Sequence, residues 1–261
     1  MGLSRDLKRA RIAYQKGDVT ASIAAHTTVA PEEHRHEHGQ YIKSAVYGGL
    51  DGIITTFAVV AGVAGAALSS GIVLILGFAN LIADGLSMAI GDYLSTKAEL
   101  EYEHAERQRE LWEVEHFPEG EKTELIEVYV EKGVPPEDAR TIVDIISRHK
   151  EAWVDIMMTE ELGIVPTDAS PVKNAVVTFV SFAGFGLVPL LAYVVARLVP
   201  GVTFNTFGVA CISTAATLFL LGALKVKVTE RNWIFSGLET LLVGGTAALA
   251  AYMVGVLLRG L

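Results

Sequence analysis

Five carboxylate, amide or thioether side chains lie inside two long apolar stretches of the sequence. Asp51 lies in the first stretch, and Asn80, Asp84, Met88 and Asp92 follow one another at intervals of four residues in the second. In an α-helix this spacing places all four on one face. Carboxylate and amide oxygens combined with a thioether sulfur favour a borderline transition metal such as Fe(II) over Mg(II) or Ca(II). We therefore predict that these five residues line a pathway for a divalent metal ion.

Asp51 and Asp84 have no lysine or arginine close by in their own apolar stretch. A lone carboxylate in the middle of a bilayer is costly, so each of them needs a partner or a function. For the other three residues structural alternatives stay open. Met88 can be a core residue, Asn80 can bridge two helices, and Asp92 can meet headgroups or water. The prediction of a metal pathway therefore depends mainly on the two aspartates.

Metal ions and protons compete for such carboxylates. Burial favours the protonated form of a carboxyl group, whereas a bound metal ion needs the deprotonated form. A site of this kind releases protons when it takes up a divalent cation, which is the basis of metal/proton antiport. Moving a cation out of a negative interior costs about 2.3 kcal/mol per charge for every 100 mV, so we expect coupling to a second ion.

A second set of candidate ligands lies in an acidic segment between the apolar stretches. Residues 97–161 hold 19 of the 30 acidic residues but only 8 of the 21 lysines and arginines. The basic residues are too few to pair with the acids along a helix, so like charges repel and a cation would relieve the repulsion. A solvated acidic face without a metal is the alternative. The candidates are Glu99, Glu103, Glu106, Glu110 and Glu113 on a first helix, Glu121, Glu124 and Glu127 on a second, and Met157, Met158 and Glu161 at the end of a third region.

Five apolar stretches are long enough to hold these residues in a membrane, because about 20 apolar helical residues cross the hydrocarbon core. Each stretch is far longer than a strand. The sequence therefore predicts an all-α polytopic membrane protein with five transmembrane helices. The stretches cover residues 41–67, 71–94, 172–199, 204–224 and 233–258. The predicted parts are a polar tail (1–40), transmembrane helices 1–2 (41–94), an acidic domain (95–166) and transmembrane helices 3–5 (167–261).

Charge and composition predict the orientation of the chain in the membrane and exclude a disordered or disulfide-linked chain. Lysines and arginines are frequent in the amino-terminal tail and missing from the first short turn, which predicts that the amino terminus and the acidic domain are cytoplasmic. A hydrophobic content of 51% excludes a disordered chain, and a single cysteine, Cys211, excludes an intrachain disulfide. The first 40 residues lack a signal-peptide pattern, so we expect the first apolar stretch to direct insertion.

Histidines provide weaker signals. Two Glu-x-x-His steps, at residues 101–104 and 113–116, resemble the di-iron ligands of ferritin-like bundles. Both lie on one predicted helix, whereas that architecture takes them from two. The tail contains His34, His36 and His38, which we interpret as pH-sensitive surface residues or weak metal ligands.

Four separated parts of the sequence together resemble the vacuolar iron transporter family. They are DGIITTFAVVAG at 51–62, SMAIGDYLS at 87–95, RELWEVEHFPEGEKTELIEVYVEKG at 109–133 followed by HKEAWVDIMMTEELG at 149–163, and TFVSFAGFGLVPL at 178–190. The resemblance implies a membrane homodimer of five-helix chains, with a three-helix cytoplasmic metal-binding domain on an extended second helix. It also implies exchange of cytosolic Fe(II), and often Mn(II), for protons.

The resemblance also assigns roles to particular residues. Asp51 and Met88 fall on the membrane metal site of the family. Two positions depart from the plant-type pattern, since Asn80 replaces a glutamate and Ser44 replaces an aspartate. We expect Asp84 to compensate, because it lies on the same helix face as Met88. The cytoplasmic metal ligands of the family fall on Glu110, Glu113, Glu121, Glu124, Met157, Met158 and Glu161.

We therefore predict a secondary active transporter, not an enzyme, that exports Fe(II) from the cytosol in exchange for protons. Mn(II), Co(II) and Zn(II) are further candidate ions. The expected partners are membrane lipid, metal ions, protons and a second copy of the chain, with no nucleic acid. The membrane is expected to be the inner cell membrane in a prokaryote or the vacuolar membrane in a eukaryote. Two alternatives stay open: a membrane-anchored ferroxidase or iron store, and a metal sensor or scaffold without transport.

Overall fold

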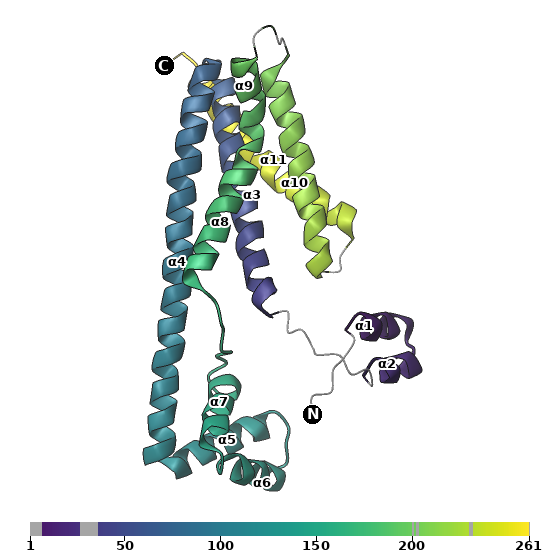
Figure 1. The fold of residues 1–261 in the computed structure, drawn as a ribbon, viewed down its shortest axis with the longest axis vertical. Helices are drawn as coiled ribbons and strands as arrows, with labels where there is room; N and C mark the ends of the chain where they lie inside the picture. Colours follow the sequence, from purple (N-terminus) through teal and green to yellow (C-terminus); the bar gives the residue numbers. More distant parts are fainter. Residues whose placement is uncertain (1–6, 27–35, 200, 202–203, 230–231, 261) are drawn as a thin grey trace. The chain divides into compact units, whose positions relative to one another are not determined.

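The computed structural model describes residues 7–26, 36–199, 201, 204–229 and 232–260, apart from the side chains of residues 7–11, 26, 36–40 and 224–229. All regular secondary structure in these residues is α-helical (Figure 1). The chain forms two compact units, residues 1–40 and 41–261, and we describe each by itself. The helices are α1 (Leu7–Lys16), α2 (Val19–His26), α3 (His36–Gly65), α4 (Ser70–His116), α5 (Pro118–Glu131), α6 (Pro136–Ile146), α7 (Lys150–Glu160), α8 (Pro171–Gly186), α9 (Val188–Leu198), α10 (Thr206–Thr229) and α11 (Trp233–Leu257).

The amino-terminal unit contains the short helices α1 and α2. Asp18 lies between them and caps α2, because its Oδ1 accepts a hydrogen bond of 2.9 Å from the backbone N–H of Ala21. The predicted histidine motif falls largely outside the described residues. His34 is not described, and neither are the side chains of His36 and His38.

Long apolar helices dominate the second unit. Among the described residues, four helices have the length and composition needed to cross a membrane, namely α3 from Tyr41 onward, α4, α10 as far as Ala223, and α11. The helices α8 and α9 make a fifth candidate if the pair is counted as one span. The prediction of an all-α polytopic membrane protein is therefore confirmed.

The third predicted span is bent rather than continuous. The axes of α8 and α9 differ by 53° at a break around Leu187. Pro189 lies in the first turn of α9, has no N–H to donate to the preceding turn, and carries a ring that would clash with that turn in a straight helix. The backbone N–H of Leu187 donates to the carbonyl of Ala183 at 3.0 Å and closes α8. Pro189 is present in the sequence, but the apolar stretch around it is long enough for one continuous span, so the bend was not predicted.

Glycines allow α3 and α8 to pack closely. A Cβ atom on Gly52 would collide with the backbone of Phe182, and a Cβ atom on Gly48 would collide with the backbone of Thr178. Small residues are the usual means of close helix packing in a membrane, where lipid is as apolar as the helices themselves. Asp51, the neighbour of Gly52, is therefore held on a tightly packed part of the fold.

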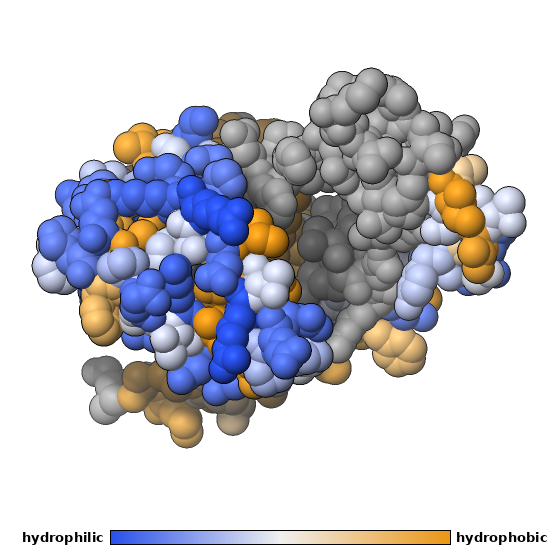
Figure 2. Space-filling model, turned by 90° about the horizontal axis from the view of Figure 1, so that it is seen from below, coloured by the Kyte–Doolittle hydropathy of each residue, from blue (hydrophilic) through white to orange (hydrophobic). Residues whose placement is uncertain are grey.

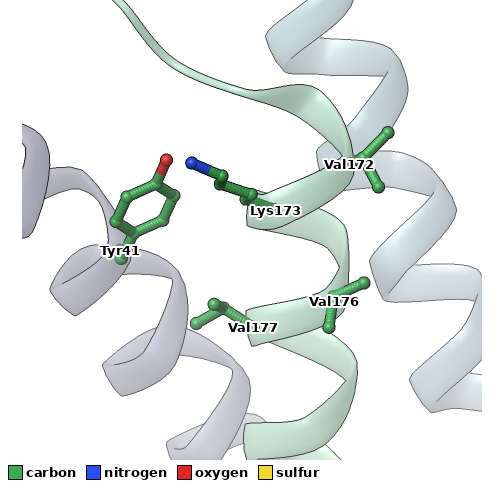
Figure 3. A pocket seen from close by; sticks show the side chains of 5 residues that line it. All are labelled: Tyr41, Val172, Lys173, Val176 and Val177. Carbon is green, nitrogen blue, oxygen red and sulfur yellow. The ribbon is translucent and has the colours of Figure 1, made fainter.

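Tyr41 and Lys173 mark one end of the α3–α8 pair. Together with Val172, Val176 and Val177 they line a shallow pocket of about 290 Å³ (Figure 3). The hydroxyl of Tyr41 and the amino group of Lys173 point toward one another in this view. Side chains with an apolar body and a polar tip are typical of the boundary between membrane and water.

Helix α4 is much longer than a membrane span. Its 47 residues extend for about 70 Å at about 1.5 Å per residue, more than twice the thickness of a hydrocarbon core of about 30 Å. The helices α5, α6 and α7 gather at its far end (Figure 1). Figure 2 looks at this end and shows mainly hydrophilic residues with small hydrophobic patches. We call residues 97–161 the acidic region.

A hydrophobic core attaches α5, α6 and α7 to α4. The prolines at 118 and 136 begin α5 and α6, because a proline in the first turn loses no helical hydrogen bond. The third region of the acidic segment forms two helices, α6 and α7, which are separated at residues 147–149. The buried members of this core are Val114, Leu125, Val143, Trp153, Val154, Met157 and Met158.

Candidate metal sites

Five glutamates from three parts of the acidic region meet at one place, which we call the glutamate cluster. Glu110 and Glu113 lie on the last turns of α4, Glu121 and Glu124 on the first turns of α5, and Glu161 directly after α7. Two groups of three carboxylates have one oxygen each within 4.8 Å of one another. The first group is Glu110, Glu113 and Glu121, and the second is Glu121, Glu124 and Glu161. Glu121 is common to both groups. The turn at Phe117 and Pro118 between α4 and α5 produces this convergence.

The glutamate cluster contains buried oxygens without a hydrogen-bond donor. Glu110 is 2% exposed and Glu121 is 3% exposed. The Oε2 atom of each is buried and has no hydrogen-bond partner. A buried carboxylate without a partner is costly, because it has lost its hydration without a replacement. The residues present fit a divalent cation, which would supply the missing positive charge to both oxygens.

The electrostatic environment raises the pKa values in this cluster. Burial, followed by the charge of Glu110, raises the pKa of Glu121 to about 7. Partial desolvation, followed by the charges of Glu110 and Glu124, raises the pKa of Glu161 to about 7. Burial also raises the pKa of Glu110, although the hydrogen bond from Arg109 opposes the change. Near neutral pH the cluster therefore holds protons that a metal ion would have to displace.

The two predicted sulfur ligands lie in the core beside this cluster. Met157 and Met158 are 0% and 1% exposed and pack with Trp153 and Leu125. The backbone N–H of Glu161 donates to the carbonyl of Met157 at 3.0 Å, which places the carboxylate of Glu161 one turn beyond the methionines. Both methionines thus have a clear packing role, and coordination by their sulfur atoms stays a prediction.

Arg109 contacts the glutamate cluster, and it was not selected from the sequence. Its guanidinium group lies 3.0 Å from Glu110, 3.4 Å from Glu113 and 3.0 Å from Glu106. The predicted ligand Glu106 is therefore an ion-pair partner of Arg109 and lies outside both glutamate groups. The spacing to Glu106 and Glu113, three residues before and four after, is the local signal that could have revealed Arg109.

The histidines of the two Glu-x-x-His steps do not join the glutamates. In the described part of the chain, neither group of candidate ligands contains a histidine. His104 is exposed. His116 stacks on Trp112 with 4.5 Å between ring centroids, and its Nδ1 is 2.8 Å from the carbonyl oxygen of Trp112. The geometry of a ferritin-like di-iron site is therefore not found among these residues.

The second candidate site lies between α3 and α4 in the apolar helices. Asp51 lies on α3 and Asp84 on α4. One turn away, the side-chain nitrogen of Asn80 lies 3.5 Å from the hydroxyl of Thr55 and donates to it. The same hydroxyl donates to the backbone carbonyl of Asp51 at 2.8 Å. Asn80 thus connects the two helices, one turn from Asp84 on α4 and, through Thr55, one turn from Asp51 on α3.

Met88 and Asp92 have different surroundings. Met88 packs against a hydrophobic cluster that includes Phe182. Asp92 accepts a hydrogen bond of 2.5 Å from the hydroxyl of Thr178 on α8, so it has a protein partner rather than only headgroups or water. One turn further along α4, the side chain of Asn174 donates to the hydroxyl of Thr96 at 3.1 Å. The polar contact between α4 and α8 includes Thr96, Asn174 and Thr178, which sequence reasoning did not select.

Comparison with known proteins identifies the family. The VIT family profile matches residues 42–256. The vacuolar iron transporter of Toxoplasma gondii is 43% identical, over 98% of this chain and 89% of that protein. The vacuolar iron transporter of Plasmodium falciparum is 38% identical, over 98% of each. Vacuolar iron transporter 1 of Arabidopsis thaliana is 31% identical, over 85% of this chain and 88% of that protein. The match of the family profile to most of the chain and these identities show that the chain belongs to the VIT family.

Proposed function

We propose that this chain carries Fe(II) across a membrane and out of the cytosol in exchange for protons. It is a transporter rather than an enzyme in this proposal. The relatives named vacuolar iron transporters support iron as the transported ion. The observation that carries the proposal is the hydrogen bond from Asn80 on α4 to Thr55 on α3, which joins two helices of membrane-spanning length one turn from Asp84 and one turn from Asp51.

The proposed mechanism uses the charge of these two aspartates. Two neighbouring carboxylates in a bilayer are strongly unfavourable when both are charged and unpaired. A divalent cation neutralises both charges at once, and so do two protons. Alternation between these two neutral states would move metal in one direction and protons in the other. In this proposal Asn80, Met88 and Asp92 line the pathway, and Asp92 changes its hydrogen bond with Thr178 as the ion passes.

The acidic region is proposed to capture metal on the cytosolic side and to supply it to the membrane site. Its glutamate cluster offers buried carboxylate oxygens without partners and pKa values of about 7 at Glu121 and Glu161. Capture would therefore release protons into the cytosol near neutral pH. Met157 and Met158 would add soft ligands that favour Fe(II) over Mg(II).

Several further features belong to the same proposal. The chain acts as a homodimer, and residues 95–166 with the amino-terminal tail face the cytosol. The membrane is vacuolar in a eukaryotic cell or the inner membrane in a prokaryotic cell. Mn(II), Co(II) and Zn(II) are additional candidate substrates, because their ligand preferences overlap with those of Fe(II).

Transport by purified protein in proteoliposomes tests the proposal. Fe(II) uptake and the internal pH would be followed together for the parent, Asp51→Asn and Asp84→Asn. A matched control is Asp144→Asn, which changes an exposed aspartate on α6. We expect both membrane variants to lose flux and proton movement, while the control retains both. Fe(II)-dependent oxygen consumption without flux would instead favour the ferroxidase alternative, and metal binding without flux would favour a sensor.

A further inference from the structure

Arg109 lies among the proposed metal ligands of the acidic region. Its Nη2 is 3.0 Å from Oε1 of Glu110, and its Nε is 3.4 Å from Oε2 of Glu113. Both glutamates belong to the group that they form with Glu121. The guanidinium group therefore pairs with two of the three carboxylates that would hold a divalent ion in this group.

We propose that Arg109 is a tethered competitor of the metal ion and sets the affinity of the glutamate cluster. This inference rests on the proposed metal-binding role of that cluster. In the metal-free protein the guanidinium neutralises part of the negative charge. A divalent ion held by the same carboxylates would lie within a few ångströms of the guanidinium, and the two cations would repel each other. Metal binding therefore requires Arg109 to withdraw from Glu113.

The surroundings of Arg109 allow this withdrawal. The side chain is 49% exposed, whereas its partner Glu110 is 2% exposed. The Nη1 atom already lies 3.0 Å from Oε2 of Glu106, which is outside both glutamate groups. Glu106 can thus retain the guanidinium after it leaves Glu113. The other oxygen of Glu110, Oε2, has no hydrogen-bond partner and stays available to the metal. Glu106 is then a partner of the displaced arginine rather than a metal ligand.

Arg107 provides a matched control two residues away on α4. It pairs with Glu151 at 2.9 Å and with Asp155 at 2.7 Å, and both partners lie on α7 outside the glutamate cluster. Replacing Arg107 with glutamine removes the same charge from the same helix without removing a partner of any proposed ligand. A general change in net charge would affect both variants equally, whereas competition at the cluster would affect only Arg109.

The test measures Mn(II) binding by titration calorimetry on the full-length protein in nanodiscs, at neutral pH and physiological salt. Mn(II) is used because it is not oxidised by air. We expect Arg109→Gln to bind Mn(II) about tenfold more tightly than the parent, or by about 1.4 kcal/mol, because the variant no longer places a positive charge beside the divalent ion. Arg107→Gln should stay within about twofold of the parent. The Mn(II) affinity of Arg109→Lys should lie between those of the parent and Arg109→Gln, because an ammonium group keeps the charge but cannot pair with two carboxylates as the planar guanidinium does.

Unchanged or weaker binding by Arg109→Gln would overturn the proposal and assign Arg109 a purely structural role. If Arg109→Gln does not fold, Arg109→Lys decides the question: tighter binding than the parent supports competition, and equal or weaker binding overturns it. A parent protein that binds no Mn(II), or binds it equally well after Glu121→Gln, would instead refute the metal-binding role of the cluster itself. The two failures are therefore distinguishable.

Discussion

Replacement of Glu121 by glutamine should make the metal-free protein more stable and its metal binding weaker. Glu121 belongs to both glutamate groups, is 3% exposed, and has one carboxylate oxygen without a partner. Its carboxylate is therefore useful for holding a cation and costly when no cation is present. Glutamine has nearly the same shape but no charge. The substitution therefore removes both the attraction for a cation and the cost of the buried charge, with little change in packing.

The magnitude follows from the pKa of Glu121, which burial and the neighbouring glutamates raise from 4.5 to about 7. At about 1.36 kcal/mol per pKa unit, the charged form is disfavoured in the folded protein by about 3 kcal/mol. Since the folded pKa lies above the unfolded one, the folded state keeps a proton that the unfolded state has released. The stability of the metal-free protein should therefore fall as the pH rises from about 4.5 to about 7, and then level off.

The assay is thermal unfolding of the full-length protein in detergent, without metal and at several pH values. Tryptophan fluorescence reports the unfolding of the acidic region. At pH 8 the Glu121→Gln variant should gain about 1–3 kcal/mol over the parent, and at pH 4.5 it should equal the parent. The control is Glu127→Gln, because this predicted ligand is exposed on α5 and lies outside both glutamate groups; it should keep the parental pH profile. Mn(II) affinity of Glu121→Gln should fall at least tenfold, or by about 1.4 kcal/mol. A variant that is less stable than the parent at pH 8 would refute the reasoning.

Other predictions concern packing. Gly52→Val should greatly reduce the yield of folded protein in detergent, measured by size-exclusion chromatography, because its side chain would meet the backbone of Phe182. Leu125→Ala should lower the stability of the acidic region by about 2–5 kcal/mol in the same thermal assay, because Leu125 is fully buried in its core. Thr178→Val should remove the hydrogen bond to Asp92 and lower the free energy of unfolding by about 1–3 kcal/mol, which lowers the melting temperature. An unchanged melting temperature would show that Asp92 finds another donor.

Local patterns in the sequence were sufficient to predict much of the architecture. Apolar stretches of bilayer length predicted the spans. The spacing of Asn80, Asp84, Met88 and Asp92 placed them along one helix, which the structure contains as α4. These features depend on neighbours within a few turns, so a single sequence carries them.

Contacts between distant residues could not be predicted in this way. The partner of Asp92 is Thr178, 86 residues later, and the partner of Asn174 is Thr96, 78 residues earlier. No local spacing connects such pairs, because they depend on how α4 packs against α8. Arg109 is a different case, because its contacts are local. Counting the charges of the whole acidic region did not single out this arginine, although its spacing allows it to reach three glutamates.

Uphill transport driven by an imposed pH gradient tests the central claim most directly. Proteoliposomes would be prepared with an acidic interior and equal Fe(II) on both sides, with an ionophore present to hold the membrane potential at zero. If Asp51 and Asp84 exchange metal for protons, the parent should accumulate Fe(II) against its gradient, and Asp51→Asn and Asp84→Asn should not. Accumulation that is independent of the pH gradient, or that survives the loss of both aspartates, would contradict the account.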